Sequence, residues 1–87
     1  MKKIAFVEDA FEHYNDWASE NRKIHAKIAA LIKDIRRNPF SGIGKPEPLR
    51  HELKSLWSRR ITDEHRLVYE VKADEIIIHS CKFHYKK

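Results

Sequence analysis

Residues 65–83, HRLVYEVKADEIIIHSCKF, contain the two strands that decide the fold. In residues 65–71 apolar and polar side chains alternate, which is typical of a strand with one face on the core. One face holds Leu67, Tyr69 and Val71, and the other holds Arg66, Val68 and Glu70. Residues 72–75 predict a turn, and residues 76–83 are expected to return as the second strand of an antiparallel hairpin, with Ser80, Lys82 and His84 sharing a face.

Two helices are predicted upstream of this hairpin. Residues 3–7 are expected to form a first strand, after which Glu8 and Asp9 place negative charge where a helix begins. Asn21 is a plausible cap for a second helix, and Asn38-Pro39 ends that helix. Its apolar stripe is Ile24, Ile28, Leu31, Ile32 and Ile35, and its opposite face is Lys27, Lys33, Asp34 and Arg37. We expect the two helices to be antiparallel with a tight link.

With a further strand over residues 57–62, the order becomes β-α-α-β-β-β. This order predicts an α+β fold with two helices on one face of an antiparallel sheet. A chain of 87 residues with 41% hydrophobic content suits one domain, residues 1–87.

Charge and cysteine content narrow the class of protein. Residues 36–66 carry eight Lys/Arg against four Asp/Glu, so most of the net +5 lies mid-chain and favours a polyanionic partner. One cysteine excludes an internal disulfide and indicates a reducing compartment, so we expect the cytoplasm. No apolar run is long enough to span a membrane.

The strand patterns also predict a site. Ser58, Arg60 and Thr62 share one face of their strand, so Arg60, Arg66 and His84 are expected together on the face that the helices leave open. Glu47, in the Lys-Pro-Glu-Pro loop, would deprotonate an RNA 2′-hydroxyl, and His84 would protonate the leaving 5′-oxygen. The arginines would hold the phosphate oxygens. No histidine or cysteine spacing indicates a metal site, and no cofactor is expected.

Several linked motifs resemble a known family, the YoeB branch of the RelE toxin superfamily. They are residues 32–40 (IKDIRRNPF), 44–51 (GKPEPLRH), 57–62 (WSRRIT), 64–69 (EHRLVY) and 81–85 (CKFHY). The resemblance implies a microbial-RNase-like fold and cleavage of messenger RNA in the ribosomal A site. It also implies a YefM-like antitoxin and binding of operator DNA only by the toxin–antitoxin complex. It leaves open whether the protein forms a homodimer.

By position, the same resemblance implies roles for six residues. Glu47 resembles the general base, Arg66 the residue that stabilises the transition state, and His84 the general acid. Accessory, substrate-binding positions are Arg50, Arg60 and Tyr85. Two alternatives stay open on the sequence. One is a binding toxin that acts by occupying the ribosome or gyrase; ParE-like toxins share the fold but not the Glu/Arg/His set. The other is a DNA-binding regulator.

Overall fold

The computed structural model describes residues 2–49 and 56–83. Along these residues the elements are β1 (Lys3–Phe6), α1 (Glu8–Glu20), α2 (Arg22–Arg37), β2 (Glu47–Pro48), β3 (Leu56–Arg60), β4 (Arg66–Val71) and β5 (Glu75–Ser80). The α+β class predicted from the sequence is confirmed. The structure adds β2, a two-residue strand that the sequence pattern did not show because prolines flank and occupy it.

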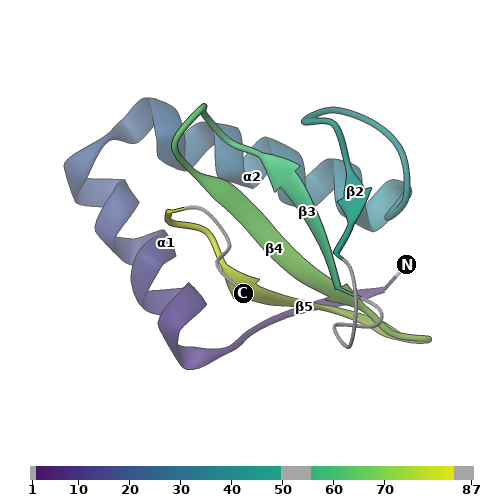
Figure 1. Ribbon diagram of the computed structural model, residues 1–87. Coiled ribbons are helices and arrows are strands. Elements are labelled where there is room, and N and C mark those ends of the chain that lie inside the picture. The colour runs from purple at the N-terminus through teal and green to yellow at the C-terminus, as the bar shows by residue number, and fades with distance from the viewer. Residues whose placement is uncertain (1, 50–55, 84–87) are drawn as a thin grey trace.

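Within the described residues, the strands form one mixed sheet in the order β1-β5-β4-β3-β2 (Figure 1). Three of the pairings are antiparallel, but β1 runs parallel to β5. The prediction of an antiparallel sheet therefore missed one pairing. A parallel pair needs a long crossover connection, and here that connection contains both helices and the three strands β2, β3 and β4.

The two helices are joined at Asn21, as predicted. The Asn21 side chain accepts the backbone N–H groups of Lys23 and Ile24, which caps α2. Figure 1 shows α1 and α2 meeting at this residue, and the antiparallel arrangement of the two helices stays a prediction. None of the helices in the described residues is long and apolar enough to cross a membrane.

The core lies between the helices and one face of the sheet. Period two along β4 and β5 sends apolar side chains to that face, and they meet the apolar stripes of α1 and α2. The buried residues include Ala10, Trp17, Ile28, Leu31, Ile35, Leu67, Tyr69, Ile76 and Ile78. The opposite face of the sheet, seen in Figure 1, carries no described helix and is the face on which a site was predicted.

The last strand is shorter than predicted. It ends at Ser80 rather than Phe83, and its register against β4 shifts between Val68 and Tyr69. Ser80 pairs with Val68 while Ile78 pairs with Tyr69, so His79 is the extra residue of a β-bulge. A bulge bends its strand and redirects the following side chains, which is why the expected alternation fails beyond this point.

Candidate active site

Strand register places three of the predicted site residues on one face of the sheet. Glu47 in β2 lies opposite Ser58 in β3, which lies opposite Val68 in β4. Arg60 and Arg66 are also directly opposite each other, two residues from Ser58 and Val68 in the direction of the β3–β4 turn. Residues directly opposite in antiparallel strands share a face. Glu47, Arg60 and Arg66 therefore share the face that carries Ser58, away from the core residues Leu67 and Tyr69.

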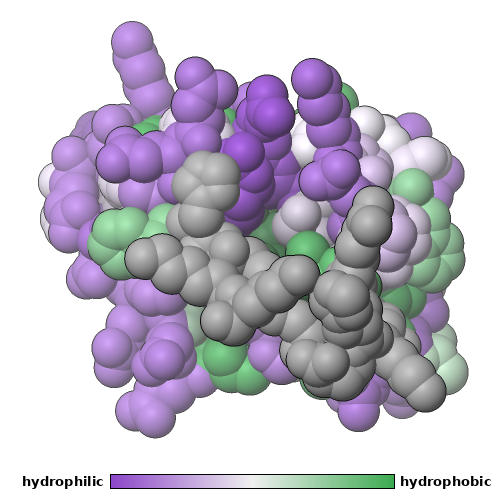
Figure 2. Space-filling model, viewed as in Figure 1, coloured by the Kyte–Doolittle hydropathy of each residue, from purple (hydrophilic) through white to green (hydrophobic). Residues whose placement is uncertain are grey.

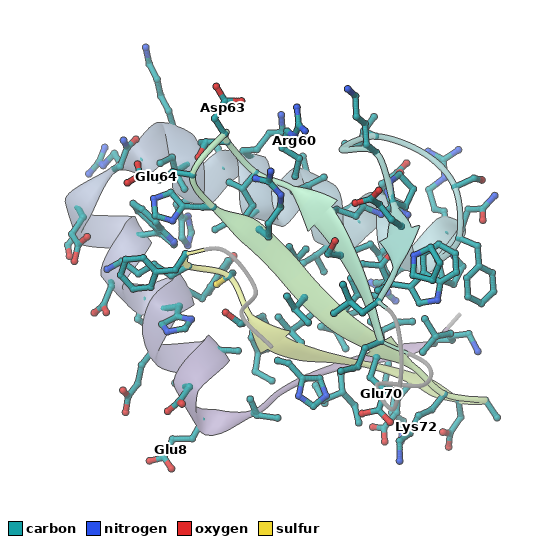
Figure 3. The ribbon with its side chains drawn as sticks, viewed as in Figure 1. Glu8, Arg60, Asp63, Glu64, Glu70 and Lys72 are labelled. Atoms are coloured by element: carbon teal, nitrogen blue, oxygen red, sulfur yellow. The ribbon has the colours of Figure 1, made fainter. Side chains whose placement is uncertain are left out.

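These residues occupy the end of the sheet next to the β3–β4 turn. Figure 3 shows Arg60 beside that turn, with Asp63 in the turn itself, whereas Glu70 lies at the far end of β4. The Glu47 and Arg60 side chains are exposed and Arg66 is half-buried. Figure 2 shows hydrophilic side chains over this end of the molecule. An exposed carboxylate and two guanidinium groups around one edge suit a phosphate-containing substrate.

The loop before β2 brings Glu47 to this edge through a close backbone approach. The Arg60 backbone N–H donates to the Gly44 carbonyl at 2.6 Å. Gly44 has φ +79°, and a Cβ there would lie 3.1 Å from the Arg60 carbonyl oxygen and 2.9 Å from a Leu31 methyl. Only glycine combines this backbone conformation with so little space. The position of Glu47 thus depends on a glycine three residues before it.

A buried arginine fastens the same loop from the other face of the sheet. Arg59 is fully buried, and its Nη1 bonds to Asp34 Oδ2 at 2.5 Å. The other guanidinium bonds go to three loop carbonyls and one hydroxyl: Ile43 O at 3.0 Å, Asn38 O at 2.7 Å, Ser41 O at 3.1 Å and Tyr69 Oη at 3.2 Å. Because one side chain joins α2, the loop and β4, Arg59 is the structural centre beneath the site.

The partners of Arg59 show the electrostatic effect of this arrangement. The Arg59 hydrogen bond lowers the pKa of Asp34, assisted by the Ile43 backbone N–H. Burial raises the pKa of Tyr69 despite its bond from Arg59, and the neutral Tyr69 hydroxyl donates to the Pro39 carbonyl at 2.7 Å. Helical periodicity predicts Asp34 on the outer face of α2, and that prediction is wrong. Arg59 comes two residues after Trp57, which faces inward, so strand alternation places the Arg59 side chain on the same inward face. An inward arginine needs a hydrogen-bonding partner, and this was the sequence signal for a partner such as Asp34.

The β3–β4 turn holds the Arg66 side chain. Its Nη1 donates to the Thr62 carbonyl at 2.6 Å and contacts the Asp63 and His65 carbonyls at 3.2 and 3.1 Å. The Thr62 hydroxyl in turn accepts the backbone N–H groups of Glu64 and His65. The guanidinium is therefore oriented before any substrate arrives, which lowers the entropy lost on binding.

The segment after β5 turns toward α1 instead of continuing the sheet. Strand alternation predicts Lys82 on the open face with Ser80, but its Nζ lies 3.3 Å from Glu20 and 5.0 Å from the Trp17 ring centroid. Trp17 Nε1 donates to the Cys81 carbonyl at 2.8 Å. The prediction for Lys82 is wrong because the bulge redirects the strand. Arg50, His84 and Tyr85 lie outside the described residues.

Comparison with known proteins is consistent with this geometry. Residues 6–85 match the family described as the YoeB-like toxin of bacterial type II toxin-antitoxin systems. The chain belongs to the YoeB-like toxin family. It is 51% identical to Toxin YoeB of Escherichia coli K12 over 83 residues, covering 95% of this chain and 99% of that protein.

Solved structures of the YoeB-like family share the whole fold. A structure described as the YoeB dimer from Staphylococcus aureus has a TM-score of 0.90 and 47% identity, covering 97% of this chain and 98% of that chain. The YoeB-YefM complex from the same species has a TM-score of 0.87 and 48% identity, covering 98% and 99%. The family resemblance inferred from the sequence motifs is confirmed. Within residues 2–49 and 56–83, no cluster of three or more potential metal ligands occurs.

Proposed function

We propose that this YoeB-like toxin is an endoribonuclease that cleaves messenger RNA in the ribosomal A site. The observation that carries the proposal is the shared face of Glu47, Arg60 and Arg66, set by strand register. Family membership supports the same conclusion. The known relatives are toxins, and inhibition of translation by message cleavage accounts for toxicity without any cofactor.

The chemistry divides among the proposed residues. Glu47 removes the proton from a ribose 2′-hydroxyl, and the 2′-oxygen attacks the adjacent phosphorus. Arg66 and Arg60 stabilise the charge on the five-coordinate phosphorus. His84 then donates a proton to the departing 5′-oxygen. The products are a 2′,3′-cyclic phosphate on the upstream fragment and a 5′-hydroxyl on the downstream fragment.

The turn contacts of Arg66 are compatible with this role. A guanidinium carries five N–H donors in a planar fork. Nη1 stays on the turn carbonyls, and Nε and Nη2 provide the edge that meets a phosphate. Arg50 and Tyr85 complete the proposed set as substrate-binding residues, Arg50 for a phosphate and Tyr85 for stacking on a base.

The ribosome orients the RNA substrate, which the exposed site does not do by itself. Glu47 is exposed on a two-residue edge strand, so the chain by itself does little to immobilise a flexible single-stranded RNA. Orienting the reacting groups contributes about 7–11 kcal/mol at best. A message already held in the A site provides that orientation, which explains why free RNA should be a poor substrate.

We further propose a YefM-like antitoxin as the partner that blocks this site. Support comes from the solved YoeB-YefM complex of a 48% identical relative. The same proposal includes cytoplasmic action, operator binding only by the complex, and a homodimer like that of the S. aureus relative.

Programmed ribosomes with a defined A-site codon test the function directly. The parent protein should cut within that codon and leave a 5′-hydroxyl that polynucleotide kinase labels without prior phosphatase. Glu47→Gln, Arg66→Gln and His84→Gln should each lose cleavage, whereas Glu12→Gln, an exposed change on α1, should cut like the parent. Stalled ribosomes carrying intact message would instead favour a toxin that acts by occupancy.

A further inference from the structure

The segment that leads into His84 is held by two histidines that the proposed mechanism does not use. Phe83 N–H donates to His65 Nδ1 at 2.7 Å, and Cys81 N–H donates to His13 Nδ1 at 3.3 Å. His65 comes from the β3–β4 turn and His13 from α1, so the segment is fixed from two separate elements. We call Cys81–Phe83 with these two imidazoles the histidine clasp.

His65 is built into the molecule rather than attached to its surface. It is 8% exposed, and its ring lies edge-on to Trp17 with the centroids 4.8 Å apart. The Phe83 ring also packs against His65, with the ring centroids 5.7 Å apart. Trp17 also donates to the Cys81 carbonyl, so one indole positions both the clasp histidine and the segment it holds.

Phe83 is fixed at both of its backbone groups. Its N–H bonds to His65, and its carbonyl accepts the Arg66 backbone N–H at 3.1 Å. Phe83 also has φ +65°, a conformation that non-glycine residues adopt rarely and keep only where contacts impose it. The same two-residue step, His65-Arg66, therefore sets the Phe83 backbone and carries the guanidinium of the proposed site.

The direction of the hydrogen bonds determines the state of both rings. A backbone amide can only donate, so each Nδ1 must accept and carries no proton. The neutral rings therefore hold their proton on Nε2, and in His65 this nitrogen faces the Glu64 carboxylate at 3.9 Å. Lys82, which belongs to the clasp, pairs with Glu20 at the end of α1.

We propose that His65 is a positioning residue for cleavage, acting through its Nδ1 acceptor on Phe83. The inference rests on the proposed role of His84, the next residue in the chain. A fixed Phe83 backbone sets the point from which the His84 imidazole reaches the leaving oxygen, and a displacement of about 1 Å can cost up to about 100-fold in rate. His13 supports the same segment at Cys81.

Two substitutions at His65 test its hydrogen-bond acceptor and its aromatic ring separately. His65→Asn keeps an acceptor oxygen near the position of Nδ1 but loses the ring, whereas His65→Phe keeps an aromatic ring and loses the acceptor. His25 is half-buried and its ring is tilted against that of Tyr14, with the centroids 4.3 Å apart, so His25→Phe is a matched control away from the clasp. Amide hydrogen exchange at Phe83, with Ile76 and Ile78 as reporters of the intact core, measures the clasp without reference to activity.

The expected result is selective. His65→Phe should lose protection at Phe83, keep it at Ile76 and Ile78, and lower the single-turnover cleavage rate at saturating toxin by about 10–100-fold with little change in ribosome affinity. His65→Asn should recover most of both losses, and His25→Phe should match the parent.

Each contrary result has a defined meaning. Parental cleavage by His65→Phe despite an unprotected Phe83 would overturn the positioning role and leave the proposed nuclease intact. Equal loss of rate by the Asn and Phe variants, both with protected cores, would also overturn it. A parent that leaves ribosome-bound message uncut would refute the nuclease itself, while Phe83 exchange would still decide whether the clasp exists.

Discussion

Replacing Arg59 by methionine removes the charge at the centre of the loop that carries Glu47, while keeping a long apolar stem in the core. The substitution leaves Asp34 without its ion-pair partner and three loop carbonyls without their donor. Removing one member of a buried ion pair typically costs about 3–5 kcal/mol. Burial of the Arg59 side chain is complete, so this range applies.

The groups that lose their partner are partly exposed, so the expected cost lies at the lower end of the range of about 3–5 kcal/mol. The Asp34 side chain is 25% exposed, and Asn38, Ser41 and Ile43 lie in an exposed loop, so water can replace part of what is lost. We expect a loss of about 3 kcal/mol in the free energy of unfolding, which is a large share of the roughly 4–13 kcal/mol typical for a domain of this size. The melting temperature should fall by about 12–24 °C.

Urea titration followed by tryptophan fluorescence measures this loss. Arg22→Met, an exposed change at the start of α2, is the matched control and should stay within about 0.5 kcal/mol of the parent. Adding Asp34→Leu to Arg59→Met should restore part of the stability, because no carboxylate is then left unpaired. An unfolding free energy within about 1 kcal/mol of the parent for Arg59→Met would refute the reasoning.

Three further predictions concern single groups. Because the pKa of Asp34 is held below its ordinary 3.8, its contribution to stability is present above that value and is lost as pH falls through the lower folded value; Asp34→Asn should flatten the acid limb of a stability–pH curve. Burial raises the pKa of Cys81 to about 12, so iodoacetamide should label it slowly at pH 8 in the native protein and rapidly in urea. Gly44→Ala should destabilise the fold by more than about 1 kcal/mol in the same urea assay, because of its positive φ and its contact with the Arg60 carbonyl.

Local patterns in the sequence predicted the helices and two of the strands well. Helical periodicity and the Asn21 cap depend on residues three or four apart, so α2 could be placed from its own sequence. Period two likewise sorted Arg60 and Arg66 onto one face, and the register of β3 against β4 agrees. The motifs are dense enough to indicate the family from the order of residues alone.

Long-range contacts decided the rest. The parallel pairing of β1 with β5, the strand β2 beside β3, and the bulge at His79 each depend on which segments meet in space. A two-residue strand with a proline has no periodicity to detect, and a bulge breaks the alternation on which prediction relies.

The same division separates the proposed site residues from those that hold them. Residue type and spacing were sufficient to nominate Glu47, Arg66 and His84, because their chemistry is visible in the side chains themselves. The hydrogen-bond partners of Arg59 and His65 became visible only in three dimensions, where each side chain bonds to backbone groups far away in the sequence. A backbone carbonyl or N–H is present at nearly every position, so sequence cannot show which one a buried polar side chain will meet; only the packed fold makes that choice.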